Sequence, residues 1–200
     1  GTRLQDFTTG SWTAFAQDAQ FISLNAARHD AAKHRSLPVV GDAKLGLGAL
    51  SAAVKGYATP AGWTAKAQAE RKAWDAYVAD NVSYGDNRPN SYAQAIGVVN
   101  ALCDKRDRVV AAAGGLPAEV TANWRTLDIG TVDVEFGFSC MGYEIAGAWG
   151  ARIAQSEQKP ERDTISFCGD GSYLMLNSDI YSSVLTRKKQ IGRASCRVRA

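Results

Sequence analysis

The 200-residue sequence lacks several patterns that mark common protein classes. It contains no run of about 18 apolar residues, so we expect no membrane-spanning helix and no membrane partner. It contains neither GxxxxGK[ST] nor GxGxxG, which argues against a P-loop and against the dinucleotide-binding fingerprint. It also has no initiating Met and no signal peptide, so we interpret "GTRLQDF" as a chain entered partway through.

Cysteine and histidine are scarce, and their spacing does not suggest a metal or redox motif. Four cysteines occur and none forms a CxxC pair: Cys103, Cys140, Cys168 and Cys196. We interpret all four as reduced structural residues, which predicts a cytoplasmic protein. The two histidines, His29 and His34, have only Asp30 beside them as a further ligand, so we expect them to be surface or loop residues rather than ligands or catalytic groups.

Charge of neither sign dominates, because 23 Lys and Arg stand against 20 Asp and Glu. Much of the positive excess lies near the C-terminus, from Arg187 onwards. A nucleic-acid-binding protein more often carries a basic face interleaved with aromatic residues across a domain, so we expect no nucleic-acid partner. A hydrophobic content of 46% is ordinary for a globular protein, and the length allows one or two domains.

The first part of the chain reads as the end of an α/β domain. Short apolar strands are expected at residues 19–25 and 36–43, and Asp42 is expected to cap a helix over 43–54. After a break rich in Gly and Pro, residues 63–80 predict an exposed connecting helix.

A polar, turn-forming stretch at residues 83–91 predicts the domain boundary. Beyond it the pattern alternates, with a helix opened by Ser91, a strand within 107–115 and a helix carrying Pro117 in its first turn. A further helix, a strand within 163–171 and a last helix follow. This alternation predicts a parallel sheet covered by helices on both faces.

Two of these strands end in glycine-rich turns, "AAAGGLP" (111–117) and "FCGDGSY" (167–173). Glycine lets backbone N–H groups approach an anion, and a following helix N-terminus favours negative charge. Asp170 would repel a bare phosphate, but it fits if Mg²⁺ lies between the carboxylate and the phosphate. Asp-Gly is also a common turn, and Asp170 could instead cap a helix beginning near Tyr173. The spacing leaves both interpretations open.

The segment "FGFSCMGYEIAGAWGA" (136–151), followed by "CGDGSYLMLNSDI" (168–180), resembles thiamine-diphosphate-dependent enzymes in their diphosphate-binding domain. The signature of that family is a GDG motif closed by a later Asn. Within the family, the sequence is most similar to the trihydroxycyclohexanedione hydrolases, which open the ring of a cyclic diketone in myo-inositol catabolism. The resemblance extends from Gly1 to about Lys189.

The resemblance implies an α/β fold that divides into four parts. Residues 1–56 would be the end of a Rossmann-like central domain, and residues 57–90 a helical linker. Residues 91–189 would be the first part of a parallel-sheet domain that binds thiamine diphosphate. The last segment, "QIGRASCRVRA" (190–200), is encoded in part by a nucleotide string resembling a sequencing adapter. We therefore expect a non-native tail without strand structure there, with a genuine basic tail as the alternative.

The resemblance also implies the cofactors thiamine diphosphate and Mg²⁺, a cyclic diketone substrate and a homo-oligomeric parent protein. Asp170 would be a Mg²⁺ ligand. Met141 would support the bent cofactor, unless it is an ordinary core methionine. The full set of implied cofactor contacts is Gly115, Leu116, Met141, Gly169, Gly171 and Ser172.

Two features of the family are missing from the sequence. The closing Asn would fall within residues 190–200, which contain none. The Glu that activates the cofactor belongs to an N-terminal domain that is not present, so no catalytic residue is assigned. An acetolactate-synthase-like carboligase or decarboxylase remains an alternative function, as does a non-catalytic α/β binding module.

Overall fold

The computed structural model describes residues 4–85, 91–135, 137–157, 162–186 and 193–194. The chain divides into two units, Gly1–Thr64 and Ala65–Ala200, each considered by itself. Most of the predicted domain boundary at 83–91 lies outside the described residues.

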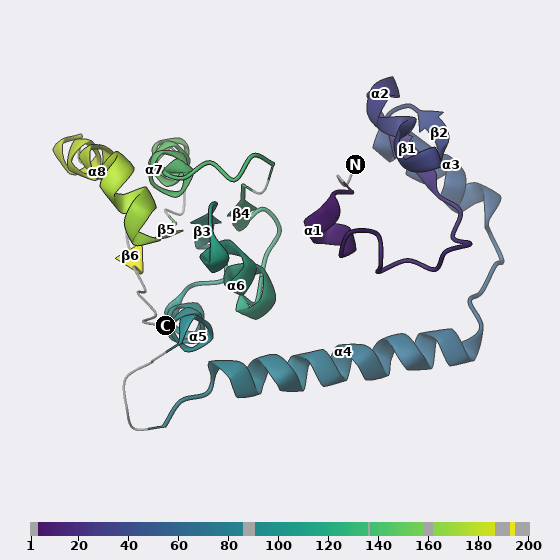
Figure 1. Ribbon diagram of the computed structural model, residues 1–200, viewed down its shortest axis with the longest axis horizontal. Coiled ribbons are helices and arrows are strands. Elements are labelled where there is room, and N and C mark those ends of the chain that lie inside the picture. Colours follow the sequence, from purple (N-terminus) through teal and green to yellow (C-terminus); the bar gives the residue numbers. More distant parts are fainter. Residues whose placement is uncertain (1–3, 86–90, 136, 158–161, 187–192, 195–200) are drawn as a thin grey trace. The chain divides into compact units, whose positions relative to one another are not determined.

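Unit 1 contains a two-stranded parallel sheet, β1–β2, with short helices around it (Figure 1). Its elements are α1 (Asp6–Thr9), β1 (Ile22–Asn25), α2 (Arg28–Ala31), a 3-10 helix (Lys33–Arg35), β2 (Leu37–Val40) and α3 (Ala43–Ala53). The predicted cap of α3 is confirmed, because the carboxylate of Asp42 accepts a hydrogen bond from the backbone N–H of Leu45 at 2.9 Å.

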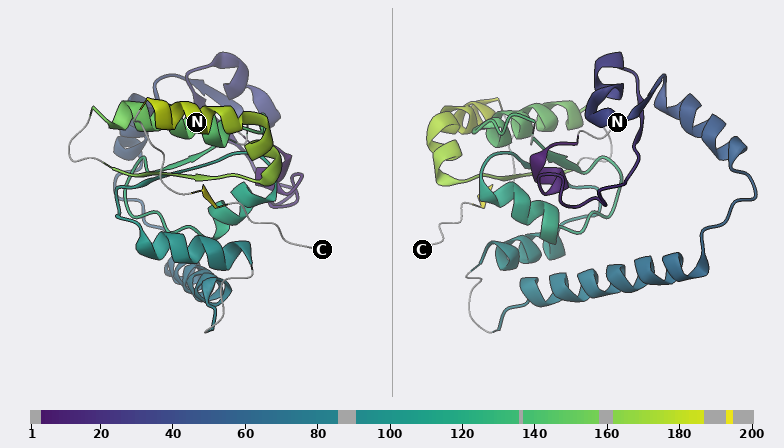
Figure 2. Two further views of the ribbon diagram at one scale, coloured as in Figure 1. Left: turned by 90° about the vertical axis from the view of Figure 1, so that its left-hand side faces the viewer. Right: turned by 45° about the vertical axis from the view of Figure 1, so that its right-hand side comes forward.

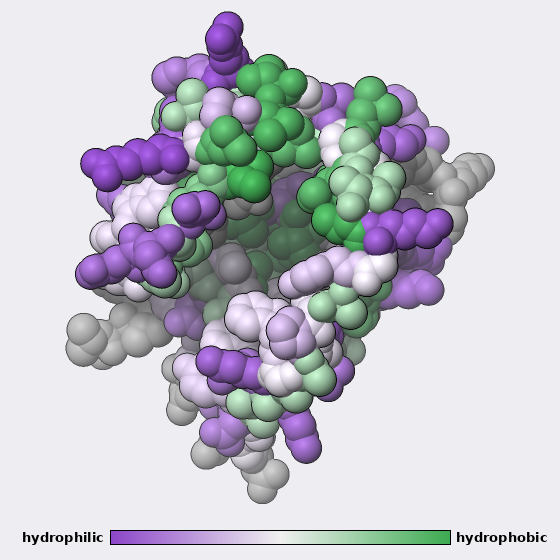
Figure 3. All heavy atoms as spheres, turned by 90° about the vertical axis from the view of Figure 1, so that its right-hand side faces the viewer, coloured by the Kyte–Doolittle hydropathy of each residue, from purple (hydrophilic) through white to green (hydrophobic). Residues whose placement is uncertain are grey.

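Apolar side chains of unit 1 lie largely at the surface. Leu37 on β2 and Leu45 on α3 are 64% and 75% exposed, and green apolar groups gather on the face shown in Figure 3. Among the residues of this unit whose burial is described, only Thr9 and Ala31 are buried. The sequence of unit 1 therefore alternates strands and helices as an α/β domain does, but the described part of the chain does not bury their apolar side chains.

A long helix, α4 (Ala61–Val82), begins in unit 1 and continues into unit 2. It spans 22 residues and buries only Val78, which confirms the predicted exposed helix. No helix in the described parts of the chain is long and apolar enough to cross a membrane.

Unit 2 alternates helices with parallel strands, as the sequence predicts (Figures 1 and 2). Its further elements are α5 (Tyr92–Leu102), β3 (Arg108–Ala111), α6 (Gly115–Asn123), β4 (Val132–Val134), α7 (Tyr143–Gln155), β5 (Thr164–Phe167), α8 (Asp170–Leu185) and β6 (Arg193–Ala194). The strand order is β4-β3-β5-β6, and all three pairings are parallel. Helices α5 and α6 cover one face of the sheet, and α7 and α8 cover the other (Figure 2). The predicted α/β fold is confirmed.

Two strands of this sheet were not expected from the sequence. The edge strand β4 has only three residues, too short to produce a periodic pattern. The expectation of no strand within 190–200 is wrong at Arg193 and Ala194, which pair with Ser166 and Phe167. In both cases an available strand edge supplies the backbone hydrogen bonds, so pairing rather than local propensity decides the structure.

The core of unit 2 lies between the sheet and the α5–α6 face. Its buried members are Ile96, Val109, Ala111, Leu116, Val120, Trp124, Ile165 and Phe167. The rings of Trp124 and Phe167 meet edge to face, with centroids 6.0 Å apart. Helix α5, which contributes Ile96 to this core, begins at its predicted cap, because Ser91 Oγ accepts the N–H of Gln94 at 3.2 Å.

We expect Phe167→Ala to destabilise unit 2 by about 3–5 kcal/mol, because it removes a buried ring and leaves a cavity beside Trp124. Urea unfolding followed by circular dichroism measures this change. Leu185→Ala on α8 is the control, since Leu185 is 82% exposed and its loss should change stability by less than about 0.5 kcal/mol. Equal stability of the two variants would contradict this description of the core.

Candidate functional site

The strand order places a topological switch point between β3 and β5. From β3 the chain passes through α6 to β4, then returns through α7 past β3 to β5. In open parallel sheets, ligands bind in the crevice beyond the carboxyl ends of strands at such a point. Ala111 pairs with Phe167, and each is followed three residues later by Gly114 and Asp170 respectively. The two glycine-rich turns predicted from the sequence therefore leave neighbouring strands at the same edge.

The turn after β3 presents backbone rather than side chains. Gly114 has φ 85° and ψ −160°, a conformation that is essentially limited to glycine, and it occupies the N-cap of α6 without a side-chain cap. Gly115 is exposed, and a Cβ placed there would meet nothing within 4 Å. Leu116 is only 6% exposed and its side chain packs in the core, so only its backbone can face a ligand.

The turn after β5 tests one of the two interpretations of Asp170, which are a helix cap near Tyr173 and a metal ligand. Helix α8 begins at Asp170 with Gly169 as its N-cap, so the alternative of Asp170 capping a helix near Tyr173 is wrong. Asp170 is exposed, and its Oδ1 accepts the N–H of Gly171 at 2.9 Å. A carboxylate in the first turn also interacts favourably with the helix macrodipole.

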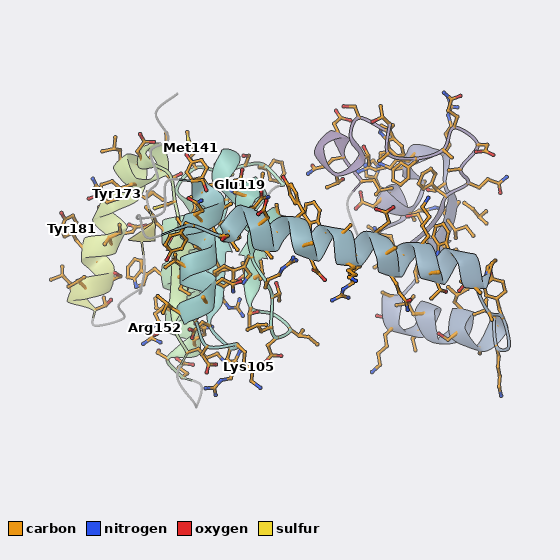
Figure 4. The ribbon with its side chains drawn as sticks, turned by 90° about the horizontal axis from the view of Figure 1, so that it is seen from below. Lys105, Glu119, Met141, Arg152, Tyr173 and Tyr181 are labelled. Atoms are coloured by element: carbon orange, nitrogen blue, oxygen red, sulfur yellow. The ribbon has the colours of Figure 1, made fainter. Side chains whose placement is uncertain are left out.

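Met141 lies beside this turn and outside the core. Its side chain is 51% exposed, so the alternative of an ordinary core methionine is wrong. A Cβ on Gly171 would lie 3.8 Å from the Met141 sulfur, which places the α7 loop against the β5 turn. Figure 4 shows Met141 at one end of unit 2 and Arg152 and Lys105 at the other. This is expected if Met141 lies at the carboxyl ends of the parallel strands and the other two residues lie at the amino ends.

Ser172 is buried, and its hydroxyl is already engaged. It is 3% exposed, and Oγ donates to Oε1 of Glu144 at 2.7 Å. If Ser172 contacts a ligand, as the sequence predicts, the contact is therefore expected from its backbone rather than from its hydroxyl. Glu144 itself was missed from the sequence, where the only signal was a carboxylate set among small and apolar residues in "MGYEIAG".

A second carboxylate, Glu135, shapes the loop that leads to Met141. Glu135 follows β4, and its two oxygens accept the N–H groups of Phe138 at 2.7 Å and Cys140 at 2.8 Å. These backbone hydrogen bonds, the one from Cys140 first, hold the pKa of Glu135 below its ordinary value of 4.5. The loop ends at Gly142, where φ is 95° and a Cβ would come within 2.6 Å of Leu176 Cδ1. Gly142 is therefore required at this position.

The described cysteines and histidines belong to no group of three potential metal ligands. Cys168 is buried, and burial, followed by the charges of Asp107 and Asp163, raises the pKa of Cys103 to about 11. Cys140 is exposed, unlike a structural cysteine; Cys196 lies outside the described residues. Both histidines are exposed. Where the structure is described, it brings no three His, Cys, Asp or Glu together as a metal site, so a cation at Asp170 would need other oxygen ligands.

We expect Glu135→Gln to loosen the 137–140 loop. Because the folded-state pKa is depressed, the ionised carboxylate stabilises the loop above pH 4.5, and this contribution is lost as the pH falls through the folded-state pKa. Amide-exchange protection at Phe138 and Cys140 should fall about tenfold in the variant at pH 6. The unaltered chain should approach the variant in acid. Glu70→Gln on exposed α4 is the control, and unchanged protection in Glu135→Gln would show that the carboxylate does not hold the loop.

Comparison with known proteins places this site in a family. Residues 112–191 match the family described as thiamine pyrophosphate enzyme, C-terminal TPP binding domain. The chain is 34% identical to the 3D-(3,5/4)-trihydroxycyclohexane-1,2-dione hydrolase of Geobacillus thermodenitrificans and 32% identical to that of Bacillus subtilis. Each alignment covers 94% of this chain, but only 32% and 33% of the relative. The chain thus spans about a third of the length of these relatives.

The matched segment begins immediately after β3 and includes both glycine-rich turns and Met141. These are the parts that the parallel sheet brings to one edge. Residues 112–191 therefore match the thiamine pyrophosphate enzyme family in its C-terminal TPP-binding domain.

Proposed function

We propose that this chain is part of a thiamine diphosphate- and Mg²⁺-dependent hydrolase that opens the ring of a trihydroxycyclohexane-1,2-dione by cleaving a carbon–carbon bond. The observation that carries the proposal is the meeting of the Gly169–Ser172 turn with Met141 at the switch point of the sheet. The names of the relatives support the substrate, a small cyclic diketone. A place in myo-inositol degradation is part of the same proposal and rests on the resemblance of the sequence.

The residues at this edge fit a diphosphate. Helices α6 and α8 begin at the exits of neighbouring strands, and the N–H groups of a first helical turn lack intrahelical partners. Both helices have a glycine N-cap without a side-chain hydrogen bond, and in the first turn of α8 the carboxylate of Asp170 accepts the N–H of Gly171. We propose that the backbones of Gly115, Leu116, Gly169, Gly171 and Ser172 contact the cofactor at its diphosphate end.

Asp170 supplies the charge that a metal needs at this edge. Mg²⁺ is commonly held by one or two carboxylates together with phosphate oxygens, so a single exposed carboxylate beside a diphosphate is a sufficient protein contribution. We propose that Asp170 is that ligand and that the side chain of Met141 supports the bent cofactor. When bound, thiamine diphosphate supplies the electron sink for carbon–carbon cleavage. The residues named here bind and orient the cofactor, and none of them is assigned as catalytic.

The domain organisation is part of the same proposal. Residues 1–56 would belong to a central Rossmann-like domain, residues 57–90 to a helical linker and residues 91–189 to the cofactor-binding domain. Residues 190–200 would be a non-native tail. The family match over 112–191 supports the third of these assignments, and the parent protein would be a homo-oligomer.

We expect Asp170→Ala to lower the affinity of the chain for thiamine diphosphate by about 10- to 100-fold, because the metal loses its anionic ligand. Asp170→Asn should be milder, since an amide oxygen can still coordinate Mg²⁺ but carries no charge. Isothermal titration at several Mg²⁺ concentrations measures both effects.

Asp179→Ala is a matched control, because Asp179 is a carboxylate on the same helix, α8, away from its first turn. It should leave both the affinity and its Mg²⁺ dependence unchanged. Unchanged affinity in Asp170→Ala would refute the metal assignment.

We also expect the 200-residue chain by itself to be catalytically inactive. The proposed chemistry requires a group that activates the cofactor, and none of the residues assigned at this edge supplies one. Incubating the purified chain with thiamine diphosphate, Mg²⁺ and the cyclic diketone, and following ring opening, tests this expectation. Cofactor-dependent turnover would show that the chain contains its own activating residue.

A further inference from the structure

Glu144 is a fully buried carboxylate at the start of α7. Its exposed fraction is 0%, and it is the second residue of a helix whose neighbouring positions include buried Ile145 and Ala148. Removing a carboxylate from water is costly unless hydrogen bonds and nearby positive potential compensate. The helix N-terminus contributes part of that potential, but the larger compensation must come from specific donors.

The two oxygens of this carboxylate bind two different turns of the site. Oε2 accepts the backbone N–H of Gly142 at 2.8 Å, which is a local contact at the start of α7. Oε1 accepts the hydroxyl of Ser172 at 2.7 Å, from a residue 28 positions further along the chain. Gly142 directly follows Met141, and Ser172 lies in the first turn of α8 with Asp170. One buried group therefore connects the Met141 loop with the Gly169–Ser172 turn.

The backbone of Glu144 adds a third connection, because its carbonyl oxygen accepts the hydroxyl of Ser166 on β5 at 2.6 Å. Ser166 and Ser172 are both buried, on either side of the turn that carries Asp170. The start of α7 is thereby held to β5 before the turn and to α8 after it. A purely local helix cap would involve Gly142 alone.

We propose that Glu144 is a positioning residue that fixes Met141 and Asp170 relative to each other through its hydrogen bonds to Gly142 and Ser172. This inference rests on the proposed function, in which both residues contact the same cofactor. Shifts of about 1 Å in groups that orient a ligand can reduce function about 100-fold, so a rigid link at this point has a large effect.

Ser172→Ala and Glu144→Gln test the link. Ser172→Ala leaves Oε1 without its donor. In Glu144→Gln an NH2 group replaces one of the two carboxylate oxygens, so the side chain no longer accepts both hydrogen bonds, from the Gly142 N–H and from the Ser172 hydroxyl. Thr164→Val is the matched control, because it removes another buried side-chain hydrogen bond between β5 and α7, from Thr164 Oγ1 to Gln155 Oε1 at 2.6 Å, near the amino end of the strand.

Titration with thiamine diphosphate at fixed Mg²⁺, with a thermal melt of each unliganded variant, provides the first readout. We expect about tenfold weaker binding in Ser172→Ala and Glu144→Gln, and no further loss in the double variant, because the two groups act as one unit. Thr164→Val should melt at a lower temperature yet bind as the unaltered chain does. If Ser172→Ala and Thr164→Val have the same affinity, Glu144 stabilises the fold without positioning the site.

Amide exchange at Gly142 provides a second readout that needs no cofactor. In Ser172→Ala the Gly142 N–H should lose protection about tenfold, although the substitution lies on another helix, and in Thr164→Val it should not. Unchanged protection in Ser172→Ala would overturn the link. Failure of the unaltered chain to bind thiamine diphosphate would count against the proposed function, while the exchange measurement would still decide whether the link exists.

Discussion

The parallel pairing of β3 with β5 is the constraint on which the rest of unit 2 depends. It aligns Arg108–Ala111 with Thr164–Phe167. In the sequence these two strands are separated by α6, β4 and α7. The register is also held at the amino end, where Asp107 Oδ1 accepts the N–H of Asp163 at 3.0 Å. Because both strands point the same way, their glycine-rich exits must emerge together. The site is a consequence of this register.

The site itself is built mainly from backbone, and buried or half-buried carboxylates hold that backbone in place. Glu135 binds N–H groups of the loop before Met141, and Glu144 binds the N–H at its end. Gly142 lies between them in a conformation and a space that a larger residue could not occupy. In the proposed function, backbone N–H groups of the glycine turns would contact a ligand with delocalised negative charge, and the exposed Asp170 would bind a cation beside it.

The sequence predicted the elements that depend mainly on interactions between residues close together in the chain. The caps at Asp42 and Ser91, the long polar helix and the strands at Arg108 and Thr164 needed only nearby residues to be recognised. Strands β4 and β6 were missed because each forms by pairing with a strand that is distant in the sequence, β3 and β5 respectively. One of the two interpretations of Asp170 began α8 near Tyr173, three residues too late, because glycine is a weak helix former.

The sequence by itself determined the alternation of helix and strand, the two glycine-rich exits and the resemblance of "CMGYEIAG" and "CGDGS" to a cofactor-binding family. Only the tertiary structure decided that Met141 is exposed beside Gly171, that Ser172 is buried and that Glu144 joins the two turns. The physical reason is that motif residues are recognised by type and spacing along the chain. Burial and the partner of a carboxylate depend on which distant segments the sheet places side by side.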